Sequence, residues 1–298
     1  MLVRNDLSGI AVPDAVEKQF GDASEAAAVE QSGGVFQNPQ ANAYINAIGQ
    51  KLVSNSKRKD FGYRFAIVND ASPNAFALPN GAVYITVGLL KLLRTEAQLA
   101  NVLGHEVSHV TEHHSSEQLA VNYGTIGLLS LASRVLAKKK DISKDDTAEM
   151  RNLVFGLISN GYSRKDENEA DEVGQKLAAK AGWDPIGMTD VMTVFNQLEG
   201  EKSNKDTLDA YMRSHPFADE RVMSANSRLK GLRQSYPNTE IGTDRYQDFL
   251  IDMLGVPESQ VRLSPIQAFK DDPLLLPGAI LGVGVIAFLL WALLKPRD

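Results

Sequence analysis

Apolar residues recur every three or four positions along most of this 298-residue chain, which is the spacing of amphipathic helices. One such segment covers residues 38–55. A second helix is predicted to begin after Thr95, because Gln98 three residues later completes a capping box. A third is predicted after Ser163, a residue type that commonly caps helices, and a fourth after Asp184.

Two short segments instead have the composition of β-strands, at residues 63–68 and 82–87. The turn signal Pro79-Asn80-Gly81 leads into the second of them. The predicted fold class is therefore α+β, mainly helical with one small β-sheet. A hairpin of these two segments that only packs against the helices is the simplest structural alternative.

The C-terminal region has a different pattern. Residues 273–294 are uncharged, and as a helix they would extend over about 33 Å, close to the thickness of a bilayer core. We expect a single transmembrane helix there, with a buried core helix as the alternative. Residues 1–6 lack the apolar region of a signal peptide, which favours a C-terminally anchored protein facing the cytosol. An export signal upstream of this sequence is the other option, and basic residues on both flanks leave the side of the membrane open.

Composition limits the kinds of partner and of metal site that this chain can have. The net charge of −6 argues against nucleic acid as a partner. The chain has no cysteine, so a metal site must be built from nitrogen and oxygen donors. The sequence leaves the oligomeric state undecided.

His105 and His109 lie four residues apart on the helix predicted after Thr95. Their imidazoles would lie on one helix face, one turn from each other, and could bind the same metal ion. Glu106 lies about 100° around the helix, where it could reach a water molecule at an open metal position. A pair of solvent-facing histidines is the alternative. His113 and His114 would continue this helix away from the metal, so we do not expect them to be ligands.

A catalytic zinc ion commonly has three protein ligands, so a third donor must come from elsewhere in the chain. Glu167 and Asp171 share a face of the helix predicted after Ser163, whereas Glu169 points away. We expect Glu167 to be the third ligand and Asp171 to accept the free N–H of a ligating histidine. An ordinary solvated, charged helix face is the alternative.

Four blocks of sequence resemble a known family. They are residues 74–84, 99–109, 167–171 and 214–216. In the same order, they resemble the HtpX-like and CAAX-prenyl-endopeptidase-like zinc metalloendopeptidases of metallopeptidase family forty-eight, over roughly residues 40–230.

The resemblance implies a zincin-like domain of the gluzincin type, in which glutamate is the third ligand of one zinc ion per chain. His105, His109 and Glu167 would bind Zn²⁺, Glu106 would be the catalytic base, and Asp171 would lie behind the ligands.

The resemblance also draws attention to His215, and Arg221 lies six residues further along the chain. His215 would approach the metal as an extra ligand or stabilise the oxyanion of the transition state; alternatively, it only caps a turn before Pro216. Arg221 would support the same region or merely pair with Asp219 and Glu220.

Substrate binding is expected at Asn74, Ala75, Phe76 and Ala77. An extended peptide can add to a free strand edge through main-chain hydrogen bonds, which suits broad specificity. The assignment of the edge rests on the resemblance.

The expected organisation has four parts. They are an N-terminal helical segment (1–37), a zinc metallopeptidase domain (38–235), a C-terminal helical segment and linker (236–272) and the transmembrane helix (273–294). We expect a membrane-anchored endopeptidase that cleaves protein or peptide substrates near the bilayer, in protein quality control. The alternative is a catalytically silent, metal-stabilised chaperone-like protein or scaffold that binds extended polypeptides. Glu106 favours the enzyme, because a binding protein has no need of a base beside the metal.

Overall fold

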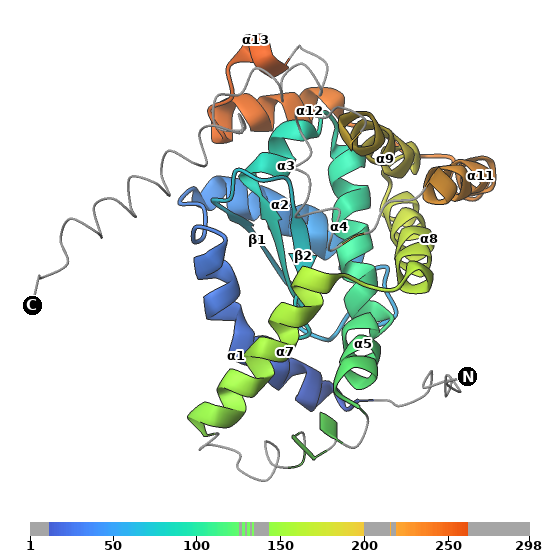
Figure 1. Ribbon diagram of the computed structural model, residues 1–298. Coiled ribbons are helices and arrows are strands. Elements are labelled where there is room, and N and C mark those ends of the chain that lie inside the picture. The colour runs from blue at the N-terminus through green and yellow to red at the C-terminus, as the bar shows by residue number, and fades with distance from the viewer. Residues whose placement is uncertain are drawn as a thin grey trace, which may run out of the picture.

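The computed structural model describes residues 12–124, 143–199 and 219–261, together with His215 and five single residues between 127 and 133. Its elements (Figure 1) are, in chain order, α1 (Asp14–Gln31), α2 (Pro39–Val53), β1 (Arg64–Val68), β2 (Ala75–Ala77), β3 (Ala82–Thr86), α3 (Val87–Leu92), α4 (Glu96–Thr111), α5 (His114–Tyr123), α7 (Lys144–Asn160), α8 (Arg164–Lys180), α9 (Ile186–Glu199), α11 (Asp219–Ser235), α12 (Thr243–Asp248), the π-helix η2 (Phe249–Met253) and α13 (Glu258–Val261).

The sheet has three strands in the order β1-β3-β2. β1 pairs with β3 in parallel, with Arg64 opposite Ala82, and β2 pairs with β3 antiparallel, with Ala75 opposite Ile85. Successive side chains of a strand point to opposite faces. Both faces are covered, because Val83 and Ile85 enter one hydrophobic cluster while Ala82 and Tyr84 enter another.

Helices form the two layers around this sheet. The larger cluster joins one face to α2, α4, α8 and α9, and it includes Tyr246 and Phe249 near the C-terminal end of the described region. The smaller cluster joins the other face to α1, α5 and α7. In Figure 1, α8, α9 and α11 lie on the far side of α4 from the sheet, so α4 is a central element of the fold.

Most of the predicted local structure is confirmed. The chain is mainly helical with one small sheet, and helices follow Asn38, Thr95, Ser163 and Asp184 as expected. The capping box of Thr95 and Gln98 is present, and Ser163 caps α8.

The two segments expected to be strands, at 64–68 and 82–86, pair in parallel, which excludes the alternative of a hairpin formed by them. Two details of the prediction were wrong. β2 was not recognised as a strand, because three residues are too few to show an alternating pattern. Finally, α4 ends at Thr111, so His113 and His114 do not continue it.

The predicted transmembrane helix at 273–294 lies outside the described residues. Among the helices that are described, none combines the length and the apolar character needed to cross a bilayer.

Candidate metal centre

The helix α4 carries two histidines of the site and is buried along its whole length. Its close approach to α8 depends on two glycines. A Cβ on Gly104 would lie 2.8 Å from the carbonyl oxygen of Gly174, and a Cβ on Gly174 would lie 2.6 Å from the backbone nitrogen of His105. Any side chain at either position would therefore push the helices apart. This contact brings the acidic residues of α8 against His105.

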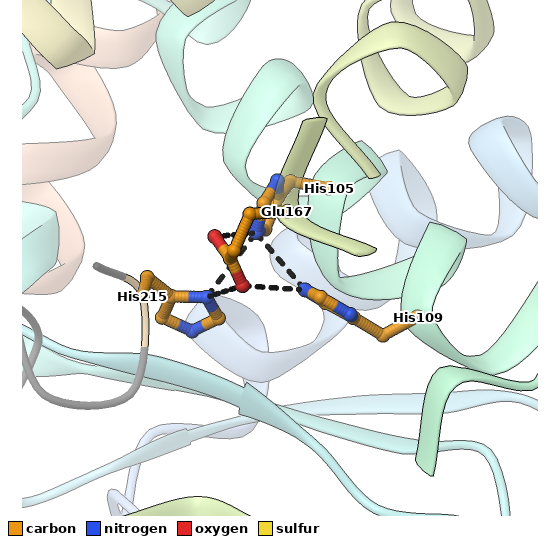
Figure 2. A group of neighbouring side chains, drawn as sticks. All are labelled: His105, His109, Glu167 and His215. Carbon is orange, nitrogen blue, oxygen red and sulfur yellow. Dashed lines mark hydrogen bonds and ion pairs between the residues drawn. The ribbon is translucent and has the colours of Figure 1, made fainter. Parts of the chain in front are cut away.

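Four donor side chains converge between these helices, as Figure 2 shows: His105 and His109 from α4, Glu167 from α8, and His215. One donor atom from each lies within 4.8 Å of all the others, and all four residues are buried. His105 Nε2 lies 3.1 Å from His109 Nε2 and 3.2 Å from His215 Nδ1. Glu167 Oε1 lies 3.1 Å from His215 Nδ1 and 3.5 Å from His109 Nε2.

These four residues, called the donor group below, fit a metal ion. Imidazole and carboxylate donors suit zinc and other divalent transition metals. Burial and the neighbouring His105 ring lower the pKa of His109 well below its ordinary value, which leaves the ring neutral with a lone pair to donate. Burial alone would raise the pKa of Glu167, but His215 and Arg221 outweigh it and lower the pKa, so the carboxylate is ionised.

Asp171 and Arg221 lie behind His105. Asp171 Oδ1 is 2.9 Å from His105 Nδ1, on the side of the ring that faces away from the donor group. Arg221 of α11 forms two hydrogen bonds of 2.7 Å with Asp171 and an ion pair of 2.8 Å with Glu167. Burial would raise the pKa of Asp171, but Arg221 outweighs it and the pKa falls to about 2. Arg221 therefore pairs with these two carboxylates of α8.

Glu106 is buried beside the donor group, with 1% of its surface exposed. Burial raises its pKa, although His215 and His105 counteract part of the effect. Its Oε1 lies 3.5 Å from His215 Nε2, and its carboxylate accepts a backbone hydrogen bond from Ala77. A carboxyl group with a raised pKa holds a proton more readily than an ordinary one, which suits a group that must take up and release a proton.

His215 contacts both Glu106 and the donor group. Burial would lower its pKa, but Glu167 and Glu106 outweigh burial and raise it to about 9. Its Nδ1 faces Glu167, whereas its Nε2 faces Glu106. The sequence left its role open. In the structure its Nδ1 lies among the four side-chain atoms that could hold a metal ion.

The residues expected to bind substrate form β2 and the position before it. β2 is an edge strand of the sheet, and the hydrogen bond from Ala77 to Glu106 brings it next to the site. Ala75, Phe76 and Ala77 are each at most 6% exposed. The side-chain oxygen of Asn74 is buried and has no hydrogen-bond partner in the described part of the chain.

Sequence reasoning missed two residues that contact His109. Tyr162 stacks on its ring, with centroids 3.8 Å apart and planes at 14°. His114 Nδ1 lies 3.0 Å from His109 Nδ1. Because α4 ends at Thr111 and the chain turns at His113, His114 folds back towards the motif. The only signal in the sequence was the proximity of His114 to the motif, since both contacts depend on packing.

Comparison with known proteins agrees with this geometry. Residues 39–229 match the model of peptidase family M48. The chain belongs to this family. The resemblance found in the sequence and the predicted enzyme class, a metallopeptidase, are thereby confirmed, and the buried donor group provides a fitting metal site.

Individual relatives of this M48 peptidase carry more specific names. A putative beta-barrel assembly-enhancing protease of Vibrio cholerae is 30% identical over 202 residues, which cover 66% of this chain and 40% of the relative. The mitochondrial metalloendopeptidase OMA1 of Schizosaccharomyces pombe is 29% identical over 179 residues, which cover 60% and 50%. The metalloprotease YcaL of Escherichia coli is 25% identical over 182 residues, which cover 61% and 67%. The matched part thus spans half or less of the first two relatives.

Proposed function

We propose that this chain is a zinc-dependent endopeptidase in which His105, His109 and Glu167 hold the metal and Glu106 is the catalytic base. The observation that carries the proposal is the position of Glu106, a buried carboxyl group of raised pKa beside the donor group. Burying a carboxylate costs free energy, and a purely structural metal site does not need one in addition to its ligands. A perturbed acid beside metal ligands is typical of an active site.

Zinc is the metal that this donor set favours, because two histidines and one glutamate form a common set of ligands for catalytic zinc. When bound, the ion would lower the pKa of a water molecule and polarise the carbonyl group of a substrate. Asp171 fixes the orientation of His105 by accepting its Nδ1–H, and Arg221 keeps Asp171 ionised.

Glu106 transfers the proton in this mechanism. Its carboxylate accepts a proton from the attacking water and then delivers it to the nitrogen of the leaving amine. Its raised pKa suits both steps, because the group must hold the proton between them. The backbone N–H of Ala77 keeps the carboxylate next to β2, where a substrate backbone would lie.

His215 is proposed as a fourth donor after it releases the proton that its raised pKa favours, because a metal ligand must be a neutral imidazole. A catalytic zinc site keeps one position for water or substrate, whereas a site with four protein ligands is closed. Because Nδ1 of His215 lies within the donor group, this residue must withdraw before substrate can enter. Near Glu106 and outside the donor group, the same imidazole could then stabilise developing negative charge.

The substrates are proposed to be extended segments of proteins. A peptide that adds to the edge of β2 would bind through its main chain, with little dependence on sequence. The unpaired side-chain oxygen of Asn74 offers one further hydrogen-bond acceptor. Since β2 is almost inaccessible, part of its cover must move before a peptide can bind.

The biological setting is proposed from the relatives and the sequence. Some relatives are named for enhancing β-barrel assembly, which favours unfolded membrane proteins as substrates and a role in protein quality control. An anchor at residues 273–294 would hold the domain at a bilayer.

Cleavage of an unfolded protein tests the enzyme. The full chain in detergent is incubated with casein, with a chelator, and with the chelator followed by excess zinc. We expect cleavage that the chelator abolishes and zinc restores. The matched variant Glu106→Gln should bind zinc as the wild type does, yet leave casein intact.

The rival proposal is a chaperone-like protein that binds polypeptides without cutting them. It predicts that wild type and Glu106→Gln both leave casein intact and protect it equally from aggregation. A zinc-loaded Glu106→Gln variant that cleaves at the wild-type rate would contradict the assignment of the base.

A further inference from the structure

The two ligand histidines of α4 have different partners at Nδ1, the ring nitrogen that points away from the donor group. His105 Nδ1 faces the carboxylate of Asp171 at 2.9 Å. His109 Nδ1 faces the imidazole of His114 at 3.0 Å. His114 is 1% exposed, so water does not compete for this contact. A histidine as partner is unusual, because ligand histidines mostly donate to carboxylates, backbone carbonyls or water.

The protons of this pair follow from the chemistry of imidazole. A neutral ring has one nitrogen that donates and one that accepts. His109 Nε2 points into the donor group and must keep its lone pair, so Nδ1 of His109 carries the proton. The Nδ1 of His114 must then accept it. The remaining proton of His114 is on Nε2, which faces Glu169 Oε2 at 3.7 Å.

We propose that His114 is a positioning residue for the metal ligand His109, acting as a neutral acceptor that fixes both the tautomer and the orientation of the ligand ring. The inference rests on the proposed function, because it assumes that His109 binds the metal. It goes further in assigning a role to a residue outside the donor group.

The start of α5 is built to hold His114 in place. His113 has a left-handed backbone conformation, with φ of 62°, which a residue other than glycine rarely adopts. Its ring is held 2.8 Å from Glu17 of α1, and Ser116 donates a hydrogen bond to the same carboxylate. Arg58 bridges α1 and the end of α4, with bonds of 2.7 Å to Glu17 and 2.6 Å to the carbonyl oxygen of Val110.

A second contact from the same turn reinforces the position of His109. Ser115 Oγ lies 2.9 Å from the hydroxyl of Tyr162, and the ring of Tyr162 stacks on that of His109. Two successive residues of α5, His114 and Ser115, therefore act on one ligand ring. His114 holds its edge, and Ser115 holds the tyrosine that covers its face.

Two substitutions of similar size separate the hydrogen bond from packing. In His114→Asn, the amide oxygen can take the place of Nδ1 as an acceptor, whereas His114→Leu fills a similar volume without one. The exposed residue Val121 on the same helix, 61% accessible, provides the control Val121→Ser. Zinc affinity of each full-length variant is measured by competition with a chelating dye, and thermal unfolding of the metal-free protein reports on folding.

We expect His114→Leu to lower zinc affinity about 10- to 100-fold, the range found for partners of metal ligands. His114→Asn should stay closer to the wild type than to the leucine variant, and Val121→Ser should match the wild type. Equal zinc affinity in the leucine variant and the wild type would overturn the proposal. So would an asparagine variant as weak as the leucine variant while both metal-free proteins unfold at the wild-type temperature.

If the leucine variant fails to fold, the asparagine variant alone decides, because a folded protein with strongly weakened zinc binding contradicts the proposed acceptor. Failure of the proposed function looks different: the wild type would bind no zinc, or would bind it without cleaving casein. In the second case the effect of His114 on zinc affinity remains measurable.

Discussion

The two sides of the candidate metal centre support His105 and His109 in different ways. On the His105 side, the carboxylate of Asp171 lies 2.9 Å from Nδ1, and Arg221 from a distant part of the chain neutralises its charge. On the His109 side, a neutral imidazole five positions further along the chain faces the ligand, with an aromatic ring stacked beside it. One support is charged and non-local, and the other is uncharged and mostly local.

The difference matters because buried charges carry a large desolvation cost. The donor group already contains Glu167, and Glu106 and Asp171 lie next to it. Arg221 compensates two of these three carboxylates by pairing with Asp171 and Glu167. Another carboxylate behind His109 would need a further buried cation. A histidine orients the ligand without adding a charge, so the uncharged side limits the electrostatic cost of the centre.

The largest effect is expected from a substitution of Glu106, which is not one of the proposed metal ligands. Glu106→Gln leaves both supports intact but removes the proton acceptor, so casein cleavage should fall about 10²- to 10⁴-fold. Zinc content, measured by elemental analysis, should stay at that of the wild type. Loss of zinc in this variant would mean that Glu106 belongs to the metal-binding set.

The substitution Arg221→Met tests the charged support of His105, which consists of Asp171 and Arg221. Two buried carboxylates would lose their cation, and we expect the free energy of unfolding to fall by about 3–5 kcal/mol. Urea unfolding of the metal-free protein measures it. Arg233→Met on the same helix is the control, because Arg233 pairs with Asp184 at the surface, where such pairs contribute about 1 kcal/mol or less. Equal losses in both variants would contradict the special role of Arg221.

Asp171→Asn asks whether the His105 side depends on charge. Asparagine keeps an acceptor oxygen for His105 but removes the carboxylate that increases the basicity of the ligand. We expect zinc affinity to fall about tenfold, measured by chelator competition. Comparison with His114→Asn sharpens the contrast: a neutral acceptor should suffice beside His109 but not beside His105. Equal zinc affinities of Asp171→Asn and His114→Asn would contradict this difference between His105 and His109.

The substitution Glu17→Gln tests whether Glu17 holds the turn that positions His114. The quantity measured is the pH dependence of the free energy of unfolding. Burial alone would raise the pKa of Glu17, but its hydrogen bonds from His113 and Ser116 and the charge of Arg58 outweigh it and lower the pKa. A lowered pKa means that Glu17 stabilises the fold above the ordinary pKa of 4.5 and that this contribution is lost as the pH falls through the folded-state value.

The variant should therefore be less stable at neutral pH and lose less stability on acidification than the wild type. Urea unfolding between neutral and acidic pH measures this, with Glu30→Gln as a control at an exposed position of the same helix. Parallel stability curves for wild type and Glu17→Gln would show that the carboxylate does not support the turn.

Much of the local structure could be predicted because it depends on short-range patterns. Capping residues mark where α4 and α8 begin, and a four-residue spacing places His105 with His109, and Glu167 with Asp171, on common helix faces. Four blocks of sequence were enough to indicate the family that the comparison confirmed. The roles of the individual site residues remain part of the proposed function.

These elements follow from the amino-acid sequence alone, because helix periodicity and capping act between residues a few positions apart. Which elements meet depends on packing in the folded chain. The close contact of Gly104 with Gly174, the pairing of Arg221 with α8 and the parallel alignment of β1 with β3 join distant segments through packing, and no short pattern encodes them. Even the nearby His114 depended on the fold, since the turn that returns it to His109 is held by Glu17 and Arg58 from other parts of the chain.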